Sequence, residues 1–410
     1  MRKRNNIFAQ DWYAWALLAC MLIGTLLLFL QGNAGMQDAL SRDLCFALGI
    51  VLLGIGFIGA HVEFGRVLGH LGATQTLVYG ITSSCIGALI YLLVSLLPIL
   101  ARWVATALFL CLTIFFLCRA RAAFDPRELF GTKRDEPLRV PCKFMTTSLL
   151  QGLSFGFLYG VLSFTGGSLH PQLEIAAFIG SALLTFVTLL VLRVDFNRAI
   201  YQIGFPLMAA GMLLSGVFFT SLGSGGFGHL AQMLGFLYLD LVLWALGSYL
   251  IRDRNQPATW VAACPSALLM AGRALGLLAG NAVPRDAAGT ALSVVAFLIA
   301  LSALWLSSGK NIRTGWGFIR PGGPEVGGEL LNACTSIAQD YGLTPRESDV
   351  LKALALGQGS EEIAKSLFIS QNTAKSHMQS IYHKIGVHSK KELHRIVTGR
   401  QRLFASSQGD

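Results

Sequence analysis

Ten long apolar stretches occupy most of the chain between residues 12 and 306. The hydrocarbon core of a bilayer is about 30 Å thick, so a helix that crosses it needs about 20 predominantly apolar residues. Each stretch meets this requirement, which predicts an all-α, polytopic bundle of about ten membrane-spanning helices in contact with lipid. The stretches cover residues 12–30, 44–62, 74–96, 99–118, 144–163, 174–192, 203–222, 229–250, 258–280 and 287–306.

The composition excludes several classes of protein. Hydrophobic residues make up 53% of the chain and charged residues only 13%, a mixture too apolar for a soluble enzyme or a disordered scaffold. The eight cysteines form no C-x-x-C pair, so we expect neither a zinc site nor a disulfide framework. The sequence also contains no assembled nucleophile, paired carboxylates or metal ligands. We therefore expect no catalytic site, no metal and no cofactor.

Basic residues are distributed unequally between the loops on the two sides of the expected bundle. One set of loops, together with the N-terminus, carries 18 Lys and Arg residues, and the other set carries 3. Cytoplasmic loops hold the excess of positive charge in membrane proteins. Because an even number of spans puts both chain ends on the same side, the distribution predicts that both termini are cytoplasmic.

The chain repeats itself at an offset of 132 residues. The loop expected at residues 62–66, after the second stretch, aligns with residues 194–198, after the sixth. Four spans separate the copies, which predicts a parallel repeat. The acid-then-arginine pattern resembles the loop motif of major facilitators, and Gly59-x-x-x-Glu63 matches its opening. The remainder departs from it, because Phe64 and Arg66 stand where that motif has a basic residue and a glycine.

The two copies of this motif each contain an acid and an arginine three residues apart. The resemblance implies that Glu63 with Arg66, and Asp195 with Arg198, form interlocking contacts of a cytoplasmic gate. Such contacts would hold the two halves of the bundle together on that side.

Two ionisable residues lie deep inside predicted spans. Asp240 falls midway along the eighth stretch and Arg273 two-thirds along the ninth. Charged groups are costly in hydrocarbon, so they mark either a structural pair or a functional site. Two interpretations stay open: a buried salt bridge between the two spans, or a ligand pocket in which Arg273 holds a carboxylate.

Two spans carry glycines at every fourth position, a spacing that puts them on one helix face. Small residues in such stripes allow helices to approach closely in lipid. Packing within the bundle is the simplest interpretation, while a pore lining and a dimer seam are alternatives. The glycines are Gly152, Gly156 and Gly160 in the fifth stretch and Gly272, Gly276 and Gly280 in the ninth.

The composition changes abruptly after the tenth stretch. Residues 1–306 are expected to form the membrane domain, and a Gly- and Pro-rich connector follows over 307–328. We expect a lead-in helix over 329–342, a small helical domain over 343–400 and a tail over 401–410.

Three short helices are expected in the small domain. Thr344, followed by Pro345 and Glu347, combines an N-cap residue, a first-turn proline and a capping-box glutamate. Ser360 and Ser370 are placed as the N-caps of the second and third helices. A short turn joins these two, which predicts a helix-turn-helix.

The C-terminal domain resembles the LuxR/GerE-type DNA-binding domain in four consecutive segments: LTPRESDVLKALALG, EEIAKSLFIS, NTAKSHMQSIYHKIGV and HSKKEL. Two positions depart from the family pattern. Ala374 replaces the usual Val, and Gly359-Ser360 replaces the usual Ser-Asn. The resemblance implies a bacterial protein that binds a double-stranded DNA operator as a homodimer, paired through its last helix.

The third helix of this domain is the expected recognition helix. Its outward side is polar and without acids, which suits a groove lined with hydrogen-bond acceptors. The outward positions are Gln371, Asn372, Lys375, Ser376 and Gln379. The resemblance implies that Lys375, Ser376 and Gln379 face base edges, and that Thr373 and Lys384 contact phosphate.

One span would suffice to hold a DNA-binding domain at a membrane, so ten spans favour a sensory role. We therefore expect a one-component transcriptional regulator in the bacterial cytoplasmic membrane, whose bundle binds a small molecule of unknown identity. The alternative is a major-facilitator-like transporter with a regulatory DNA-binding tail. An uptake assay in vesicles separates the two.

Overall fold

The structure is a computed structural model, and the part of the chain that it describes is helical throughout, without a β-strand. The chain is described here over residues 11–32, 39–124, 129, 142–162, 171–218, 226–252, 256–307, 328–355, 358–367 and 369–406. The connector expected at 307–328 lies outside these ranges except for its two end residues.

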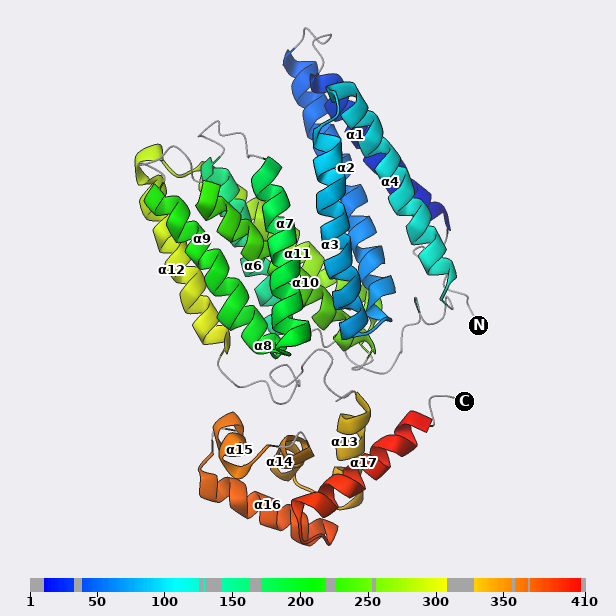
Figure 1. Ribbon diagram of the computed structural model, residues 1–410, viewed down its shortest axis with the longest axis vertical. Coiled ribbons are helices and arrows are strands. Elements are labelled where there is room, and N and C mark those ends of the chain that lie inside the picture. Colours follow the sequence, from blue (N-terminus) through cyan, green and yellow to red (C-terminus); the bar gives the residue numbers. More distant parts are fainter. Residues whose placement is uncertain are drawn as a thin grey trace.

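Within the described residues, ten helices are long and apolar enough to cross a membrane, which confirms the number and positions expected from the sequence. Two of them include π-helical turns, η3 (Phe186–Val191) and η4 (Ala199–Gly204). The span that contains η4 begins with the short helix α8 (Phe196–Arg198), and the last span begins with the short segment η5 (Arg285–Ala287). The main helices, shown in Figure 1, are α1 (Asp11–Gly32), α2 (Ala39–Gly69), α3 (Ala73–Ser95), α4 (Ile99–Ala122), α6 (Cys142–Leu162), α7 (Pro171–Thr185), α9 (Phe205–Phe218), α10 (Gly226–Arg252), α11 (Ala258–Asn281) and α12 (Ala288–Ser307).

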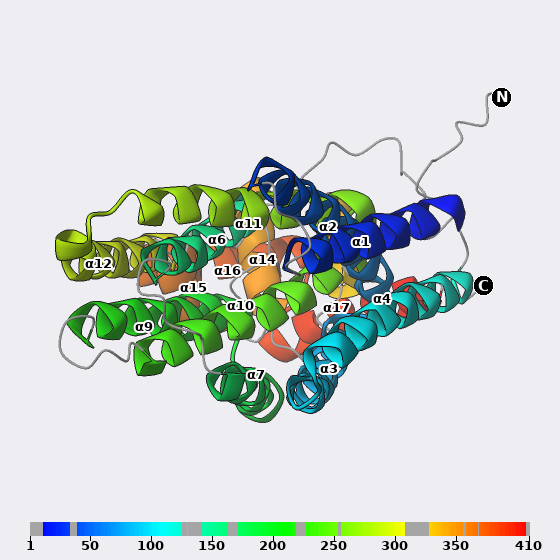
Figure 2. The ribbon, with the colours of Figure 1, turned by 90° about the horizontal axis from the view of Figure 1, so that it is seen from above.

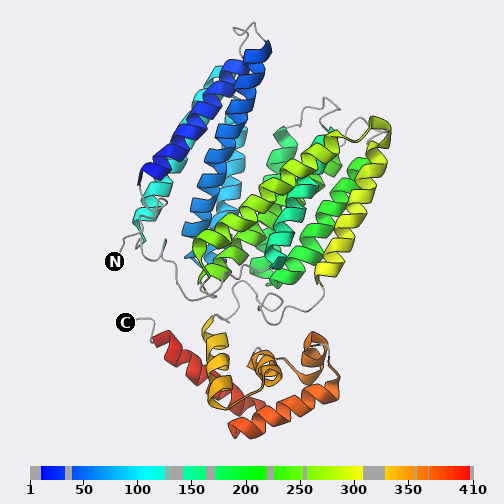
Figure 3. The ribbon, with the colours of Figure 1, turned by 180° about the vertical axis from the view of Figure 1, so that it is seen from behind.

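Five further helices follow at the side of the bundle on which α12 ends (Figures 1 and 3). The first corresponds to the expected lead-in helix. The last runs beyond residue 400, where the sequence was expected to pass from domain to tail; the domain boundaries stay predictions. The helices are α13 (Gly328–Asp340), α14 (Pro345–Ala355), α15 (Ser360–Leu367), α16 (Gln371–Ile385) and α17 (Lys390–Ser406).

The buried apolar side chains of the bundle form two clusters. The smaller cluster joins α1, α2 and α4 through residues such as Met21, Ala60 and Ile114. The larger cluster joins α6 to α12, with Tyr238 and Leu239 of α10 fully buried at its centre.

The two glycine stripes, one on α6 and one on α11, face each other where these helices lie side by side (Figure 2). A Cβ atom built on Gly152 would lie 2.1 Å from the carbonyl oxygen of Leu269, and one on Gly156 would lie 2.1 Å from that of Arg273. On the other helix, a Cβ on Gly276 would lie 2.3 Å from the carbonyl oxygen of Leu153. The backbones touch directly, so these stripes pack within the bundle and are neither a pore lining nor a dimer seam.

The two copies of the acid–arginine motif differ in backbone structure. Residues 62–66, expected as a loop, lie within the unbroken helix α2. The second copy does break the helix: Arg193 has a positive φ of 51°, and Asp195 caps the short helix α8. Glu63 and Arg66 form a buried ion pair three residues apart in α2, and this pair stabilises the helical conformation of the first copy. The parallel repeat and the likeness to major facilitators stay predictions.

Changing Gly156 to Ala tests the contact between α6 and α11. The added methyl group has no room against the α11 backbone, so we expect the variant to lose about 1–3 kcal/mol of stability, as overpacked sites do. The apparent melting temperature of the full-length protein in detergent measures the loss. Gly87→Ala on α3 is the control, because a Cβ there meets nothing within 4 Å. Equal melting temperatures for the two variants would contradict the close backbone contact between α6 and α11.

Candidate functional site

The start of α14 is fixed by a reciprocal capping box. The backbone N–H of Thr344 donates to Oε2 of Glu347 at 2.7 Å, and the N–H of Glu347 donates to Oγ1 of Thr344 at 3.3 Å. The two groups satisfy amide donors that the first helical turn leaves free. The capping predicted from Thr344, Pro345 and Glu347 is therefore confirmed.

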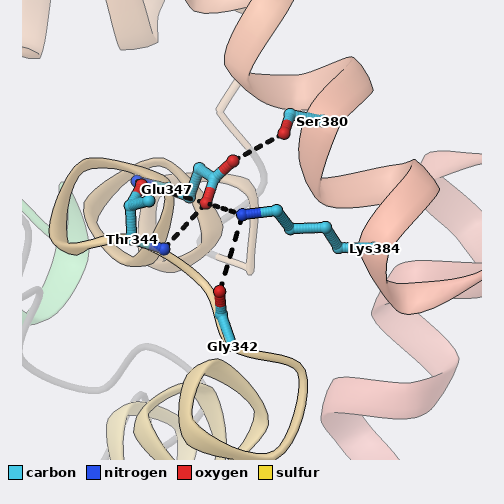
Figure 4. Close-up of polar contacts among 5 residues, drawn as sticks. All are labelled: Gly342, Thr344, Glu347, Ser380 and Lys384. Atoms are coloured by element: carbon cyan, nitrogen blue, oxygen red, sulfur yellow. Dashed lines mark hydrogen bonds and ion pairs between the residues drawn. The ribbon is translucent and has the colours of Figure 1, made fainter.

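The Glu347 carboxylate also ties α14 to α16 (Figure 4). It accepts a hydrogen bond from Oγ of Ser380 at 2.5 Å, and Nζ of Lys384 lies 2.7 Å from its Oε2. Lys384 further donates to the carbonyl oxygen of Gly342 at 3.5 Å. One buried carboxylate thus sets where the expected recognition helix lies relative to α14.

The pKa of Glu347 reflects this environment. Burial disfavours the charged carboxylate, but the hydrogen bonds from Lys384, Ser380 and Thr344 outweigh it and lower the pKa to about 2. Hydrogen bonds to the charged form of an acid act in this direction. Glu347 is therefore ionised throughout the physiological range.

The helix-turn-helix consists of α15 and α16. Ser370 caps α16 as predicted, because its Oγ accepts the backbone N–H of Thr373 at 3.0 Å. Gly386, with φ of 77°, ends α16 in the left-handed conformation that glycine adopts readily. The cap predicted at Ser360 is wrong by one residue, because α15 already includes Ser360. The start is also set by Glu362, whose carboxylate accepts the N–H of Gly359 at 2.9 Å.

The buried stripe of α16 holds the helix against α14 and α15. Ala374, Ile381 and Ile385 are buried in the core of this domain, and Met378 is partly buried against it. Small Ala374 is fully enclosed where the related family usually has Val. The departure is therefore a packing change on the inner side and leaves the outer side untouched.

The outward side of α16 is exposed as expected. It carries no acid along its whole length. The exposed residues are Gln371, Asn372, Thr373, Lys375, Ser376 and Gln379. Three of these side chains already have partners within the protein: Gln371 reaches Oγ of Ser360 at 3.4 Å, Thr373 shares a hydrogen bond with Ser370, and Ser376 donates to the carbonyl oxygen of Asn372. Contacts of these residues with DNA stay a prediction.

Lys384 lies differently from the other expected DNA contacts. Its ammonium group is bound to Glu347, so its position is explained by the link between α14 and α16. The sequence motif indicated a basic residue at this point but carried no sign of its partner 37 residues earlier.

The last helix of the domain packs against the lead-in helix. Arg400 of α17 forms an ion pair with Asp340 of α13 at 2.8 Å and donates to Oγ of Ser336 at 2.9 Å. Leu330 and Cys334 of α13 are buried in the same apolar core as Val397 of α17. The expected lead-in helix is thus an integral part of the C-terminal domain.

Two interpretations were open for Asp240 and Arg273, and the first of them, a salt bridge, is absent among the ion pairs of the described residues. Arg273 instead lies over a pair of aromatic rings that touch each other, with its guanidinium carbon 4.9 Å from the ring centre of Phe155 and 4.7 Å from that of Phe236. Cation–π contacts of this kind stabilise a guanidinium group without a carboxylate. Sequence reasoning missed these contacts because the two phenylalanines lie on α6 and α10, far from Arg273 in the chain.

Asp240 lies at a cavity between α2, α6, α10 and α11. The cavity has a volume of about 60 Å³, and His61, Gln151 and Trp244 line it together with Asp240. Sequence reasoning missed these three neighbours. Trp244 follows Asp240 by one helical turn and so offered a local signal, whereas nothing in the sequence connects His61 or Gln151 to Asp240.

The two gate pairs have unlike surroundings. Oε1 of Glu63 lies 2.7 Å from Nη1 of Arg66, with both side chains buried, and Nε of Arg121 on α4 lies 3.9 Å from the other carboxylate oxygen. Asp195 instead caps α8 and pairs with Arg198, whose side chain is 66% exposed. Glu63 thus connects α2 to α4, whereas Asp195 and Arg198 pair only with each other, three residues apart. A gate in which the two motifs interlock stays a prediction.

Comparisons with known proteins agree with the geometry of the C-terminal domain. Residues 341–397 match the sequence model of a family described as "Bacterial regulatory proteins, luxR family". This segment, which forms α14 to α16 and part of α17, is a LuxR-family helix-turn-helix domain. No solved structure matches the chain.

Several known proteins are similar to the same segment. The CsgBAC operon transcriptional regulatory protein of Escherichia coli is 44% identical over 50 residues, which are 12% of this chain and 23% of that protein. The nitrate/nitrite response regulator protein homolog of Haemophilus influenzae is 44% identical over 48 residues, 12% of this chain and 23% of its own length. The uncharacterized transcriptional regulatory protein YhcZ of Bacillus subtilis is 47% identical over 47 residues, which are 12% of this chain and 22% of that protein. The chain thus spans less than a quarter of the length of these relatives.

The lowered pKa of Glu347 predicts how the stability of this domain depends on pH. A glutamate in the unfolded chain has a pKa of about 4.3. The ionised Glu347 carboxylate therefore stabilises the fold above that pH, and this stabilisation is lost as the pH falls toward the folded-state pKa of about 2. We expect on the order of 2–3 kcal/mol to be lost over this interval. Hydrogen exchange of α14 and α16 amides in the full-length protein, corrected for intrinsic rates, measures it.

Two variants control this experiment. Glu347→Gln should be less stable at neutral pH and should lose less stability than the wild type as the pH falls below about 5, because the amide does not titrate and Glu392, whose pKa is also lowered, still does. Glu361→Gln, on the exposed side of α15, should keep the wild-type profile. A Glu347→Gln profile as steep as that of the wild type would show that another acid is responsible.

Proposed function

We propose that the chain is a membrane-integrated, one-component transcriptional regulator that binds a double-stranded DNA operator through residues 343–400 and responds to a small molecule in its helix bundle. The observation that carries the proposal is the exposed, acid-free side of α16, held in place by the Glu347 link to Lys384 and Ser380. The likeness of residues 341–397 to LuxR-family regulators supports it.

The dimensions and charge of α16 suit DNA. Its 15 residues span about 22 Å at 1.5 Å per residue, a length that fits along the major groove. Lys375, Ser376 and Gln379 face base edges, and the amide groups at the start of the helix, beside Gln371 and Asn372, lie near a phosphate. Thr373 contacts phosphate at the same end, whereas Lys384 positions the helix through Glu347.

Membrane integration rests on the ten long apolar helices. Many of their large apolar side chains, including Leu96, Leu304 and Trp305, are exposed on the outside of the bundle. A surface of this kind is unstable in water and suits lipid. The basic loops then put α13 to α17 in the cytoplasm, where DNA is accessible, and a homodimer pairs through α17 to read two half-sites.

Sensing rests on the cavity beside Asp240, since an ionisable group inside a span marks a functional site. A ligand bound there contacts α2 on one side and α6, α10 and α11 on the other, and so changes the relative tilt of the two helix groups. A coupling of about 1–3 kcal/mol, typical of allosteric proteins, changes operator affinity between about fivefold and 150-fold.

Changing Lys375 to Ala tests DNA recognition. We expect the variant to bind an operator, selected from random sequence with the wild-type protein, about 10–100-fold more weakly, because a base contact contributes about 1–3 kcal/mol. Lys352→Ala removes the same charge from α14, on the side that faces Cys334 of α13, and should bind within about twofold of the wild type. Wild-type footprint protection by the Lys375→Ala protein would contradict the assignment.

Reporter fusions test the orientation in the membrane. Green fluorescent protein fused after Asp410 should fluoresce, because it folds in the cytoplasm, and alkaline phosphatase fused after Val283, between α11 and α12, should be active outside it. The expectation follows from the excess of basic residues in the other set of loops. The reverse pattern, or release of the chain from membranes by alkaline carbonate, would contradict membrane integration as proposed.

A further inference from the structure

The described lining of the cavity between α2, α6, α10 and α11 includes one acidic side chain, Asp240, and no basic side chain other than His61. Asp240 is the sole acid among the described residues that line it, and they include no Lys or Arg. No Lys, Arg or His nitrogen lies within 4.0 Å of the Asp240 carboxylate in the part of the chain that is described. An acid that faces a cavity without an ion-pair partner is costly in its charged form, and a cation bound beside it would stabilise that form.

Gln151 adds a second acceptor to the same cavity. Its side chain is completely buried, and its Nε2 donates to the carbonyl oxygen of Phe236 at 3.0 Å. That contact fixes the orientation of the amide and leaves Oε1 without a hydrogen-bond partner. A buried acceptor of this kind costs free energy unless a donor reaches it. The cavity therefore lacks a donor at this point.

The hydroxyl groups in the lining strengthen this bias toward acceptors. Ser148 donates its proton to the carbonyl oxygen of Phe144 at 3.1 Å, and Ser266 donates to that of Ala262 at 2.7 Å. Each hydroxyl has one proton, so what it still offers to the cavity is a pair of acceptor positions. A ligand that matches this lining brings several N–H donors.

Trp244 supplies an aromatic wall. Its ring lies 4.5 Å from the ring of His61, at an interplanar angle of 79°, and both side chains line the cavity. An indole ring attracts a cation more strongly than the other aromatic side chains do. The wall therefore favours the same class of ligand as Asp240.

The nearby positive charge of Arg273 does not occupy this cavity. Its guanidinium group lies over the adjoining rings of Phe155 and Phe236, and it is not among the residues that line the space. Arg273 and Asp240 thus interact only through space. The Asp240 side chain lines the cavity and accepts a hydrogen bond from Trp244, which lines it too.

The position of the cavity connects it with the cytoplasmic end of the bundle. Its lining runs from Asp240, near the middle of α10, to Ile251 at the end of that helix, and includes Val261 near the start of α11. This is the side on which α12 ends and α13 to α17 follow (Figure 3). A volume of about 60 Å³ holds about four water-sized groups, the size of a short alkyl amine.

We propose that this cavity is a binding site for a small organic cation, such as a primary alkylammonium ion. Its N–H groups donate to Asp240 and Gln151, and its alkyl chain lies among Leu243, Val261 and Leu269. The role of the cation as a signal rests on the proposed function, whereas its binding does not. Arg273 is then a structural residue and does not hold a ligand carboxylate.

The test compares three probes of equal size and different charge. The full-length protein in detergent, in an amine-free buffer, is titrated calorimetrically with propylammonium, propanol and propionate. We expect propylammonium to bind at least tenfold more tightly than the other two. The absence of saturable propylammonium binding, or equal or tighter binding of propionate, would overturn the proposal.

Variants locate the bound cation. Asp240→Asn should weaken propylammonium binding at least tenfold, and Gln151→Leu should weaken it less, because it removes a neutral acceptor. Asp286→Asn, an exposed acid at the far end of the bundle, should bind as the wild type does. Unchanged affinity in a folded Asp240→Asn protein would overturn the site. If that variant fails to fold, the comparison of the three probes on the wild-type protein still decides.

Operator binding separates this inference from the proposed function. Operator affinity is measured with and without saturating propylammonium, using the wild-type protein. A cation that binds through Asp240 without changing operator affinity leaves the site standing and contradicts its sensory role. A change in operator affinity that persists in Asp240→Asn contradicts the site and leaves sensing in place.

Discussion

The direct contact between the backbones of α6 and α11 is the constraint around which the bundle is arranged. Gly152 and Gly156 leave no space between the two helices, so the side chains next to them must turn outward from the seam. Gln151, which precedes Gly152, reaches the Phe236 carbonyl of α10, and Arg273, which follows Gly272, reaches the Phe236 ring. A stripe of residues without side chains thus directs the polar side chains of two helices onto a third.

The C-terminal domain uses a carboxylate for a comparable purpose. Glu347 completes the cap of its own helix and binds two residues of α16, so one side chain couples local helix formation to the packing of another helix. Because the group is charged and buried, its hydrogen bonds are strong and its loss is costly. The outward side of α16 is therefore free to vary in sequence without losing its position.

Features with a local cause were predictable from the sequence. Hydropathy placed the ten apolar helices, and capping residues such as Thr344 and Ser370 placed the starts of α14 and α16. The partners of Arg273 and Lys384 were not predictable, because each depends on helices brought together by the fold. Residues 62–66 were expected to form a loop but belong to α2, for a related reason. The buried contacts of Glu63 with Arg66 and with Arg121 of α4 stabilise the helix, and the sequence does not show them.

The short connection between the two parts of the chain limits where the regulator acts. Twenty residues, 308–327, separate the end of α12 from the start of α13, and a chain of that length cannot extend beyond about 70 Å. Under the proposed function, in which the bundle is integrated in a membrane, a domain tethered in this way would not travel along the chromosome in search of its site. The operator would instead have to come within this reach of the membrane, so the rate of encounter would depend on the motion of the DNA and on where in the cell the gene lies.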